Sequence, residues 1–411
     1  MKYRVQPMLL GVSAAMMASL GSQTVLADAI ADALTSGKVY GDFRLRYEHV
    51  DQDNDLKDAD GLTLRSRLGY QTGEVSGFSA LVEFEDSRTV AGVDDYNDKT
   101  SGNNTEYSVI ADPETTEVDQ GYLQYTGHGL TSKLGRQVIK YDNVRFVGDV
   151  GWRQDRQTFD AISFDYTPLE NLAFKYAYLD QRNRIFAEKK DLDSKDHLIN
   201  ASYQTQIGKI VGYGYLLEED EPGELAYDTY GLSFTGAANL IDSLSLLYHA
   251  EYASQEKTQD GTPDYDADYL FFEAGLGVAG ITARLGYEMQ GSDDGDYGFA
   301  TPLATLHKFN GWTDQFLTTP DEGLVDIYAA VNGELWGGKW TVAYHDFSAA
   351  KDSHISDDFG DEINISYARD FGEHYYVGIK YATYSADDPA NAGATTYADT
   401  DKFWVWGGVK F

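Results

Sequence analysis

Three arginines and a tryptophan are concentrated in one short stretch of the chain. Arg145, Trp152, Arg153 and Arg156 lie in the middle of LGRQVIKYDNVRFVGDVGWRQDRQTFDAISFD, which runs from Leu134 to Asp165. The formal net charge of the protein is −35, so a local cluster of cations is unusual. Arginine stays charged in any pore-like environment and offers planar, forked donors to carboxylate or phosphate groups. One hypothesis is therefore an anion-handling constriction inside a barrel.

A second hypothesis gives these arginines a structural role. The same stretch contains four acidic residues that could pair with them and fix the loop, namely Asp142, Asp149, Asp155 and Asp160. The stretch alone leaves both hypotheses open.

The residues on either side of the arginines alternate between apolar and polar. Leu134–Ile139 and Phe159–Tyr166 both have a period of two, which predicts two adjacent strands of a large sheet. The same pattern recurs along the chain and predicts about eighteen strands, each near the ~9–11 residues that a tilted strand needs to cross a bilayer. These segments are 39–50, 61–71, 77–87, 117–126, 132–140, 158–167, 171–181, 196–205, 208–218, 228–236, 242–253, 267–279, 280–290, 324–334, 338–348, 361–371, 374–385 and 401–411.

The connections between these segments alternate in length. Short ones such as 168–171 and 372–374 take turns with long acidic ones such as 88–116 and 291–323. Short periplasmic turns and long extracellular loops produce this alternation in bacterial outer-membrane barrels. All seven prolines after Pro7 fall in the predicted connections or at their edges, where no ladder hydrogen bond is lost.

The composition favours the same fold class. The chain has 31 tyrosines, 19 phenylalanines and no cysteine, while its mean hydropathy is only −0.44. A transmembrane barrel combines these properties because only alternate residues face lipid and aromatic girdles mark both interfaces. We therefore predict an all-β transmembrane antiparallel barrel without helix in the mature chain. A soluble β-helix or sandwich is the alternative.

Both ends of the chain carry signals for export. Lys2 and Arg4 precede an apolar run that ends near Leu20, and cleavage is expected after Ala27. This divides the chain into a signal peptide, 1–27, and a single barrel domain, 28–411. The aromatic terminus Phe411 resembles the signal by which the barrel-assembly machinery recognises its substrates. We expect a location in the bacterial outer membrane, in contact with lipid and lipopolysaccharide.

Other candidate chemistry is weaker. The acidic loops 51–60 and 293–296 could bind divalent cations loosely, but 51–60 lacks the sixth-position glycine and distal glutamate of an EF-hand. His249 and His345 fall on predicted inward faces without a nucleophile motif such as GxSxG. We therefore expect no cofactor, no resident metal and no enzymatic activity.

Several blocks of sequence resemble the alginate export family of outer-membrane porins. The most specific are Gly135-Arg-Gln137, Arg145-Phe-Val-Gly148, Gly151-Trp-Arg-Gln154, Gln157-Thr-Phe-Asp-Ala161 and Thr301-Pro-Leu-Ala-Thr-Leu-His-Lys-Phe-Asn-Gly-Trp312. The resemblance implies a monomeric barrel of 18 strands with an arginine-lined conduit. The arginines of the family's conduit correspond by motif to Arg136, Arg145, Arg153 and Arg156, and by strand register to Arg46 and Arg65.

The resemblance implies a passive channel for anionic solutes such as uronate-type sugars or small anions, and no nucleic-acid partner. A dedicated export pore for an anionic polysaccharide such as alginate is the alternative, although alginate exporters are longer and have an extended periplasmic turn. A barrel enzyme is a further alternative. We also expect the apolar residues of 301–320 to fold inward or to cap the barrel mouth, because leaving each in water would forgo roughly 1.5–3 kcal/mol.

Overall fold

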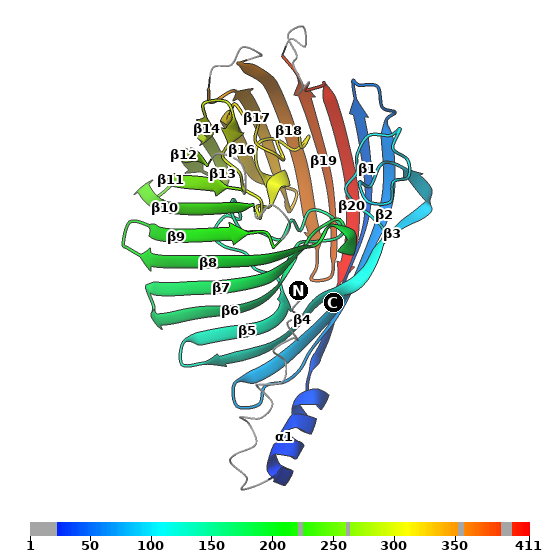
Figure 1. The fold of residues 1–411 in the computed structure, drawn as a ribbon, viewed down its shortest axis with the longest axis vertical. Coiled ribbons are helices and arrows are strands. Elements are labelled where there is room, and N and C mark those ends of the chain that lie inside the picture. The colour runs from blue at the N-terminus through cyan, green and yellow to red at the C-terminus, as the bar shows by residue number, and fades with distance from the viewer. Residues whose placement is uncertain (1–22, 221–224, 260–263, 352–356, 388–396) are drawn as a thin grey trace.

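The computed structural model describes residues 23–220, 225–259, 264–351, 357–387 and 397–411. In this part of the chain, eighteen long antiparallel strands form one sheet (Figure 1). The strands are β1 (Lys38–Gln52), β2 (Ala59–Gln71), β3 (Phe78–Asp95), β4 (Thr115–Gly127), β5 (Leu130–Gln137), β6 (Thr158–Leu169), β7 (Leu172–Asn183), β8 (Leu192–Gln204), β9 (Lys209–Glu218), β10 (Ala226–Ile241), β11 (Leu244–Thr258), β12 (Tyr265–Val278), β13 (Ile281–Gln290), β16 (Leu324–Leu335), β17 (Gly338–Ser348), β18 (Asp358–Phe371), β19 (Tyr375–Ser385) and β20 (Thr400–Lys410).

The sheet closes into a barrel. Each of these strands pairs with its neighbours in the sequence, and β1 pairs with β20 from Asp42↔Lys410 to Gln52↔Thr400. Closure leaves no free sheet edge, which is what a sheet needs in order to span a bilayer. The predicted number and order of the strands are confirmed, and the fold is the predicted all-β antiparallel barrel.

Alternation along each strand separates the two faces of the wall. On β2, Thr63, Arg65 and Arg67 are buried in the interior, whereas Leu68 is 47% exposed on the outside. Large apolar residues are exposed on strands all around the barrel, for example Leu45, Phe84, Leu123, Phe174, Ile199, Leu232, Phe272, Leu285, Ile327, Ile365, Ile379 and Val405. An apolar outer face over a polar interior is the pattern of a lipid-embedded barrel.

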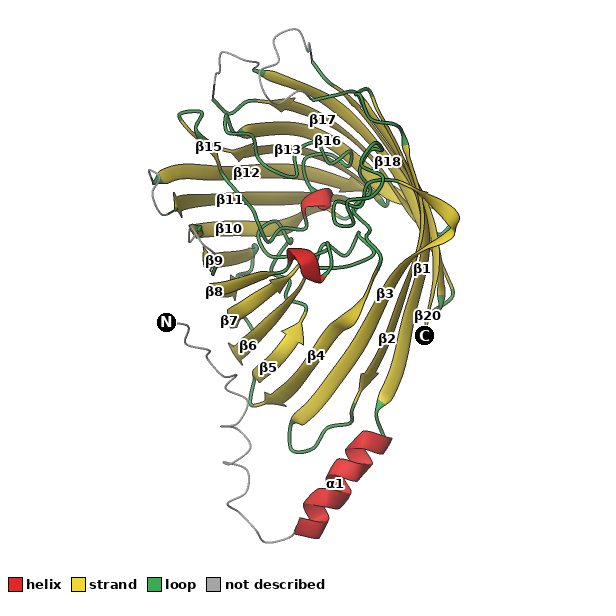
Figure 2. Ribbon diagram, turned by 45° about the vertical axis from the view of Figure 1, so that its right-hand side comes forward, coloured by secondary structure: helices red, strands yellow, loops and turns green. Residues whose placement is uncertain are grey.

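The ends of the barrel differ as predicted. The turns at one end are tight, such as Gly127–Leu130 between β4 and β5, while the connections at the other end are long. Two of the long connections enter the barrel, as Figure 2 shows: the β5–β6 loop (138–157) and the β13–β16 loop (291–323), which includes the short pair β14 (Ser292–Asp293) and β15 (Tyr297–Gly298) and the 3-10 helix η3 (Leu306–Lys308). A further 3-10 helix, η2 (Glu188–Lys190), lies between β7 and β8.

The structure contains one α-helix that the sequence analysis did not predict. The helix α1 (Gln23–Thr35) precedes β1 and continues past Ala27, so the expectation of no helix after this residue is wrong. The strand pattern begins only at Lys38, and the preceding segment ADAIADALT has four alanines, which favour a helix. The predicted signal peptide lies outside the described residues except for 23–27. No described helix is long and apolar enough to cross a membrane.

Candidate functional site in the barrel interior

The β5–β6 and β13–β16 loops are bonded to each other inside the barrel. Val147 and Leu303 form a parallel β-bridge, and the Gly148 N–H donates to the Leu303 carbonyl at 2.8 Å. Thr305 N–H returns a bond to the Val144 carbonyl at 3.0 Å. Leu303 is completely buried. The prediction that 301–320 folds inward is confirmed, and the two loops form one body that fills part of the lumen.

The interlocked loops carry their own apolar core against the barrel wall. Val147, Phe299 and Leu303 belong to one buried cluster with Tyr213 and Tyr269 of the wall. Phe146 packs against the same cluster, with its ring edge-on to Tyr269 and the centroids 5.2 Å apart. Burying these side chains supplies much of the free energy that holds the loops inward, about 1.5–3 kcal/mol for each large residue.

Arg145 anchors the loops to the wall. Its side chain is 1% exposed, its Nε donates to Glu288 Oε1 of β13 at 2.6 Å, and its Nη2 donates to Asn310 Oδ1 at 3.0 Å. Burial alone would lower the pKa of Arg145, but the attraction of the Glu288 carboxylate outweighs it, so the pKa of Arg145 is raised. The guanidinium is therefore charged, paired and shielded from solutes.

Arg153 joins three elements at once. Its Nη1 donates to both carboxylate oxygens of Glu48 on β1, at 3.1 and 3.0 Å, and its Nη2 donates to Asp314 at 2.9 Å. Arg46 of β1 pairs with Asp112 and lies with its Cζ 4.9 Å from the centroid of Trp152. These contacts tie the arginine-rich stretch to the strand at which the barrel closes.

The other three predicted arginines are also paired. Arg156 donates through Nε and Nη2 to Asp119 of β4, at 3.1 and 2.6 Å. Arg136 forms a fork with Asp160 on the neighbouring strand, at 2.8 and 3.1 Å. Arg65 pairs with Asp42 at 2.9 Å.

Most of these partners differ from those that the local sequence suggested. Only Arg136 pairs with one of the four expected acids, Asp160, whereas Asp142 and Asp149 pair with Lys209 and Lys140. The arginines of the loop instead reach acids of the barrel wall that lie far away in the sequence. The role of the six arginines in solute passage stays a prediction, and among them Arg153 alone lines the cavity described next.

A cavity of about 750 Å³ lies between the loops and the wall on the side of the long connections. We call it the vestibule. Six cationic and three acidic side chains of the described residues line it, which gives an excess of three positive charges. The cations are Lys99, Arg153, Arg182, Arg184, Lys257 and Lys402, and the acids are Glu219, Asp314 and Asp321.

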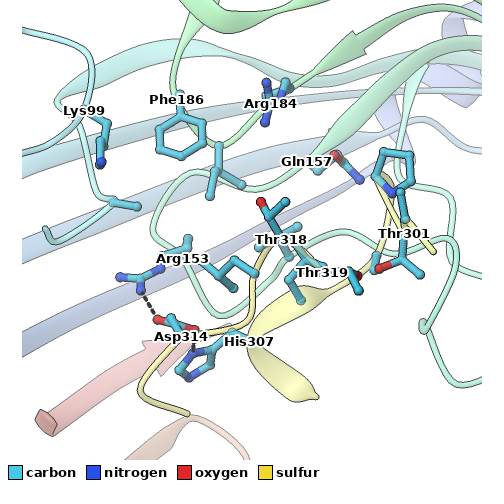
Figure 3. Close-up of a pocket in the computed structure, with 18 of the residues that line it drawn as sticks. Lys99, Arg153, Gln157, Arg184, Phe186, Thr301, His307, Asp314, Thr318 and Thr319 are labelled. Carbon is cyan, nitrogen blue, oxygen red and sulfur yellow. Dashed lines mark hydrogen bonds and ion pairs between the residues drawn. The ribbon is translucent and has the colours of Figure 1, made fainter. Parts of the chain in front are cut away.

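Three of these cations have no carboxylate within ion-pair distance among the described residues, namely Lys99, Arg184 and Lys257. The Arg184 guanidinium lies 5.6 Å from the Phe186 ring centroid, and Lys257 Nζ lies 4.9 Å from that of Tyr297. Figure 3 shows Lys99, Phe186 and Arg184 along one side of the vestibule and the hydroxyls of Thr301, Thr318 and Thr319 across it. Burial lowers the pKa of Arg184, as expected for a cation without a close counter-ion.

These three residues were not predicted from the sequence. They lie at the end of β11 or in outer connections, where no apolar alternation shows which way a side chain points. A lysine or arginine within an acidic loop was the signal available, and it was too weak to separate them from Lys189 and Lys190, which do not line the vestibule.

The predicted weak sites have ordinary local roles in the structure. In loop 51–60, Asp60 accepts a hydrogen bond from Tyr47 and contacts His49 at 3.0 Å. Asp294 pairs with Lys351 at 2.8 Å. His345, on an inward face as predicted, contacts Asp326 at 3.0 Å. Binding of divalent cations at the outer loops stays a prediction.

A closed barrel of 18 strands with loops folded into its lumen is an outer-membrane porin fold. The structure resembles the crystal structures of Pseudomonas aeruginosa OccK9 (OpdG) and Acinetobacter baumannii OccAB3, each with a TM-score of 0.70 over 92% of this chain. OccK9 is 12% identical in sequence and is covered over 99% of its length. OccAB3 is 15% identical and is covered over 100% of its length. Pseudomonas aeruginosa OccK3 (OpdO) aligns with a TM-score of 0.68, 13% identity and coverage of 95% of this chain and 99% of its own. At these identities the likeness concerns the fold.

The sequence also matches the alginate export family over residues 35–206, which confirms the resemblance in this part of the chain. The matched range includes Arg46, Arg65, Arg136, Arg145, Arg153 and Arg156, whereas the Thr301–Trp312 block lies outside it. Among curated proteins, no sequence matches. The barrel, its apolar outer face and the family match together indicate the bacterial outer membrane as the location of the protein.

Proposed function

We propose that the protein is a passive outer-membrane channel that selects anionic solutes, such as uronate-type sugars or small anions, at the vestibule. The observation that carries this proposal is the set of three cations without a close carboxylate among the described residues, Lys99, Arg184 and Lys257, around the vestibule of a protein whose net charge is −35. Exposed acids more than about 8–10 Å away are largely screened at physiological salt. The nearby cations therefore dominate the potential that a solute meets.

The chemistry of the lining suits a sugar acid. A carboxylate can pair with Arg184 or Lys257, the threonine hydroxyls can bond to sugar hydroxyls, and the rings of Phe186 and Tyr297 offer apolar faces. A small anion would use the cations alone. The vestibule volume of about 750 Å³ accommodates one or a few sugar units.

The family match gives a specific reason to keep polysaccharide export as a second candidate. An export pore would have to pass a continuous polymer, and here the β5–β6 and β13–β16 loops occupy the lumen with buried ion pairs. The described turns at the end opposite the long loops are also short. These features favour passage of small solutes. Assays of purified protein with ester and peptide substrates test the remaining alternative, a barrel enzyme.

Planar bilayer recordings test the proposal. In a salt gradient the wild-type channel should show an anion-selective reversal potential, and glucuronate should block its current at lower concentration than glucose. Neutralising the vestibule with Arg184→Gln and Lys257→Gln should raise the half-blocking glucuronate concentration about tenfold or more, since hydrogen bonds to charged groups contribute roughly 1.5–3 kcal/mol.

The matched control neutralises two exposed lysines of the same β7–β8 connection, Lys189→Gln and Lys190→Gln. It removes the same charge and should leave block and reversal potential unchanged. A cation-selective wild type, or equal block of both double variants, would refute anion selection at the vestibule.

A further inference from the structure

A buried group of three carboxylates lies where the β5–β6 loop meets the wall. Glu85 of β3, Glu117 of β4 and Asp155 of the loop each have a carboxylate oxygen within 4.8 Å of the others. Glu85 is 1% exposed and Asp155 is completely buried, while Glu117 is half-buried. Like charges brought this close in a buried place are strongly unfavourable unless something neutralises them.

Two buried oxygens in this group have no hydrogen-bond donor among the described residues. Glu85 uses Oε2 to accept from Arg67, and Asp155 uses Oδ2 to accept from the Ala187 N–H at 3.1 Å. Their second oxygens, Glu85 Oε1 and Asp155 Oδ1, are buried and lack any partner in the structure. A buried acceptor left unsatisfied costs about 1–3 kcal/mol, and more when it is charged.

The charges around the group do not balance. Among the described residues, Arg67 is the one cation that contacts the group, and Arg67 also lies 3.6 Å from Asp119. Arg156 and Arg136, nearby in the wall, are engaged by Asp119 and Asp160. Three carboxylates against one guanidinium leave two negative charges, which is the charge that one divalent cation neutralises.

We propose that Glu85, Glu117 and Asp155 form a buried calcium site that fastens the β5–β6 loop to the barrel wall. Calcium prefers oxygen ligands at about 2.3–2.6 Å, so two of its ligands can be up to about 5.2 Å apart, and the spacing here falls within this limit. Magnesium demands shorter bonds of about 2.0–2.1 Å in a stricter geometry and should bind less well.

The site would also order the vestibule. Ala187, which donates to Asp155, belongs to the β7–β8 connection that carries Arg184 and Phe186. A cation that holds Asp155 in place thereby positions this connection. The inference does not depend on which solute passes, so failure of the calcium test leaves the proposed anion selection standing.

Calcium binding to the full-length protein in detergent tests the site. After treatment with a chelator, equilibrium dialysis with radioactive calcium at pH 7.5 should show one tight site per chain. Asp155→Asn should weaken this site about tenfold or more, because calcium affinity follows the charge of the ligand set. The control Asp53→Asn with Asp55→Asn removes two acids from an exposed outer loop and should leave the tight site intact.

A second variant and a second measurement guard against misfolding. If Asp155→Asn does not fold, Glu117→Gln at the half-buried position gives the same comparison. Calcium should raise the unfolding midpoint of the wild type in urea and have little effect on either site variant. Absence of stoichiometric binding at pH 7.5, or equal affinity in wild type and variants, would overturn the proposal. An infrared band of a protonated Asp155 carboxyl would then assign the neutralising role to a proton.

Discussion

The Nζ of Lys380 lies 2.9 Å from Nε2 of His307 inside the barrel, and the opposite ring nitrogen, Nδ1, lies 2.6 Å from Asp314 Oδ1. Because the carboxylate of Asp314 can only accept, Nδ1 carries the proton that is donated to Asp314, and Nε2 accepts from Lys380. The imidazole is thus a neutral link between a buried lysine and a buried carboxylate. It also stacks on Trp152 with ring centroids 4.9 Å apart.

This arrangement predicts a loss of stability in mild acid. Burial, opposed by Asp314 and reinforced by Lys380, lowers the pKa of His307 to about 3. In the unfolded chain, His307 has an ordinary pKa near 6.5 and binds a proton that the folded protein excludes. The free energy of unfolding is therefore highest above about pH 6.5. It falls by up to ~1.4 kcal/mol per pH unit as the pH drops toward 3. His307→Gln retains an acceptor for Lys380 and should flatten this decline. Urea unfolding in vesicles between pH 7 and pH 4 measures it, and parallel curves for wild type and variant would contradict the assignment.

Breaking the Arg145–Glu288 pair should destabilise the protein strongly. Glu288→Gln would leave a guanidinium that is 1% exposed without its counter-ion, which typically costs about 3–5 kcal/mol. Arg88→Gln is a suitable control because Arg88 pairs with Asp86 at the surface, where such pairs contribute about 0–1 kcal/mol. Urea unfolding midpoints of both variants, measured in vesicles, give the comparison. Similar small losses in the two would show that the buried pair adds little.

A disulfide between the two inward loops should leave conductance unchanged. Val147→Cys and Leu303→Cys lie opposite each other in a β-bridge, and the chain has no other cysteine. Residues paired across neighbouring strands are about 5 Å apart, which a disulfide can span. Since the structure already holds the loops together, single-channel conductance should be the same before and after reduction. A rise in conductance upon reduction would mean that the loops separate during transport.

Removing the inward part of the β13–β16 loop should enlarge the pore. Replacing residues 301–319 with a short glycine–serine linker removes Leu303, Asn310 and Asp314, which contact the β5–β6 loop. Single-channel conductance should rise because the lumen loses much of its filling. Replacing the exposed residues Asp53–Leu56 with the same linker is the control and should leave conductance unchanged. Equal conductance of wild type and the first variant would place the narrowest point elsewhere.

The wall of the barrel could be predicted from the sequence because it repeats a local rule. On β2, residues such as Arg65 and Leu68 face opposite sides simply by their positions in a strand, and lipid excludes charge from one side. The inward course of 301–320 followed from its apolar residues. The helix α1 could not be predicted from the alternation that marks the strands, because that alternation has a period of two, which a helix lacks.

The partners of the loop arginines could not be predicted in the same way. Arg153 bonds to Glu48 and Arg145 to Glu288, across 105 and 143 positions of the sequence. A loop has no repeating geometry, so nothing local shows which strand it will face. Nearby acids such as Asp149 were the natural candidates, but they bond elsewhere. Changing Arg145, Arg153 and Arg156 to glutamate would therefore oppose like charges in buried places and test folding more than selectivity.

The long sequence separation between the two inward loops has a consequence for the order of assembly. Every second pair of neighbouring strands meets through a short turn, whereas the bond between Arg145 and Asn310 joins positions 165 residues apart. Chain entropy favours contacts that close short segments first. The wall should therefore assemble as a succession of hairpins, and the loops should dock only once the strands around them are in place. A freshly inserted barrel would conduct freely until its lumen fills, so newly made copies should pass through a brief leaky stage.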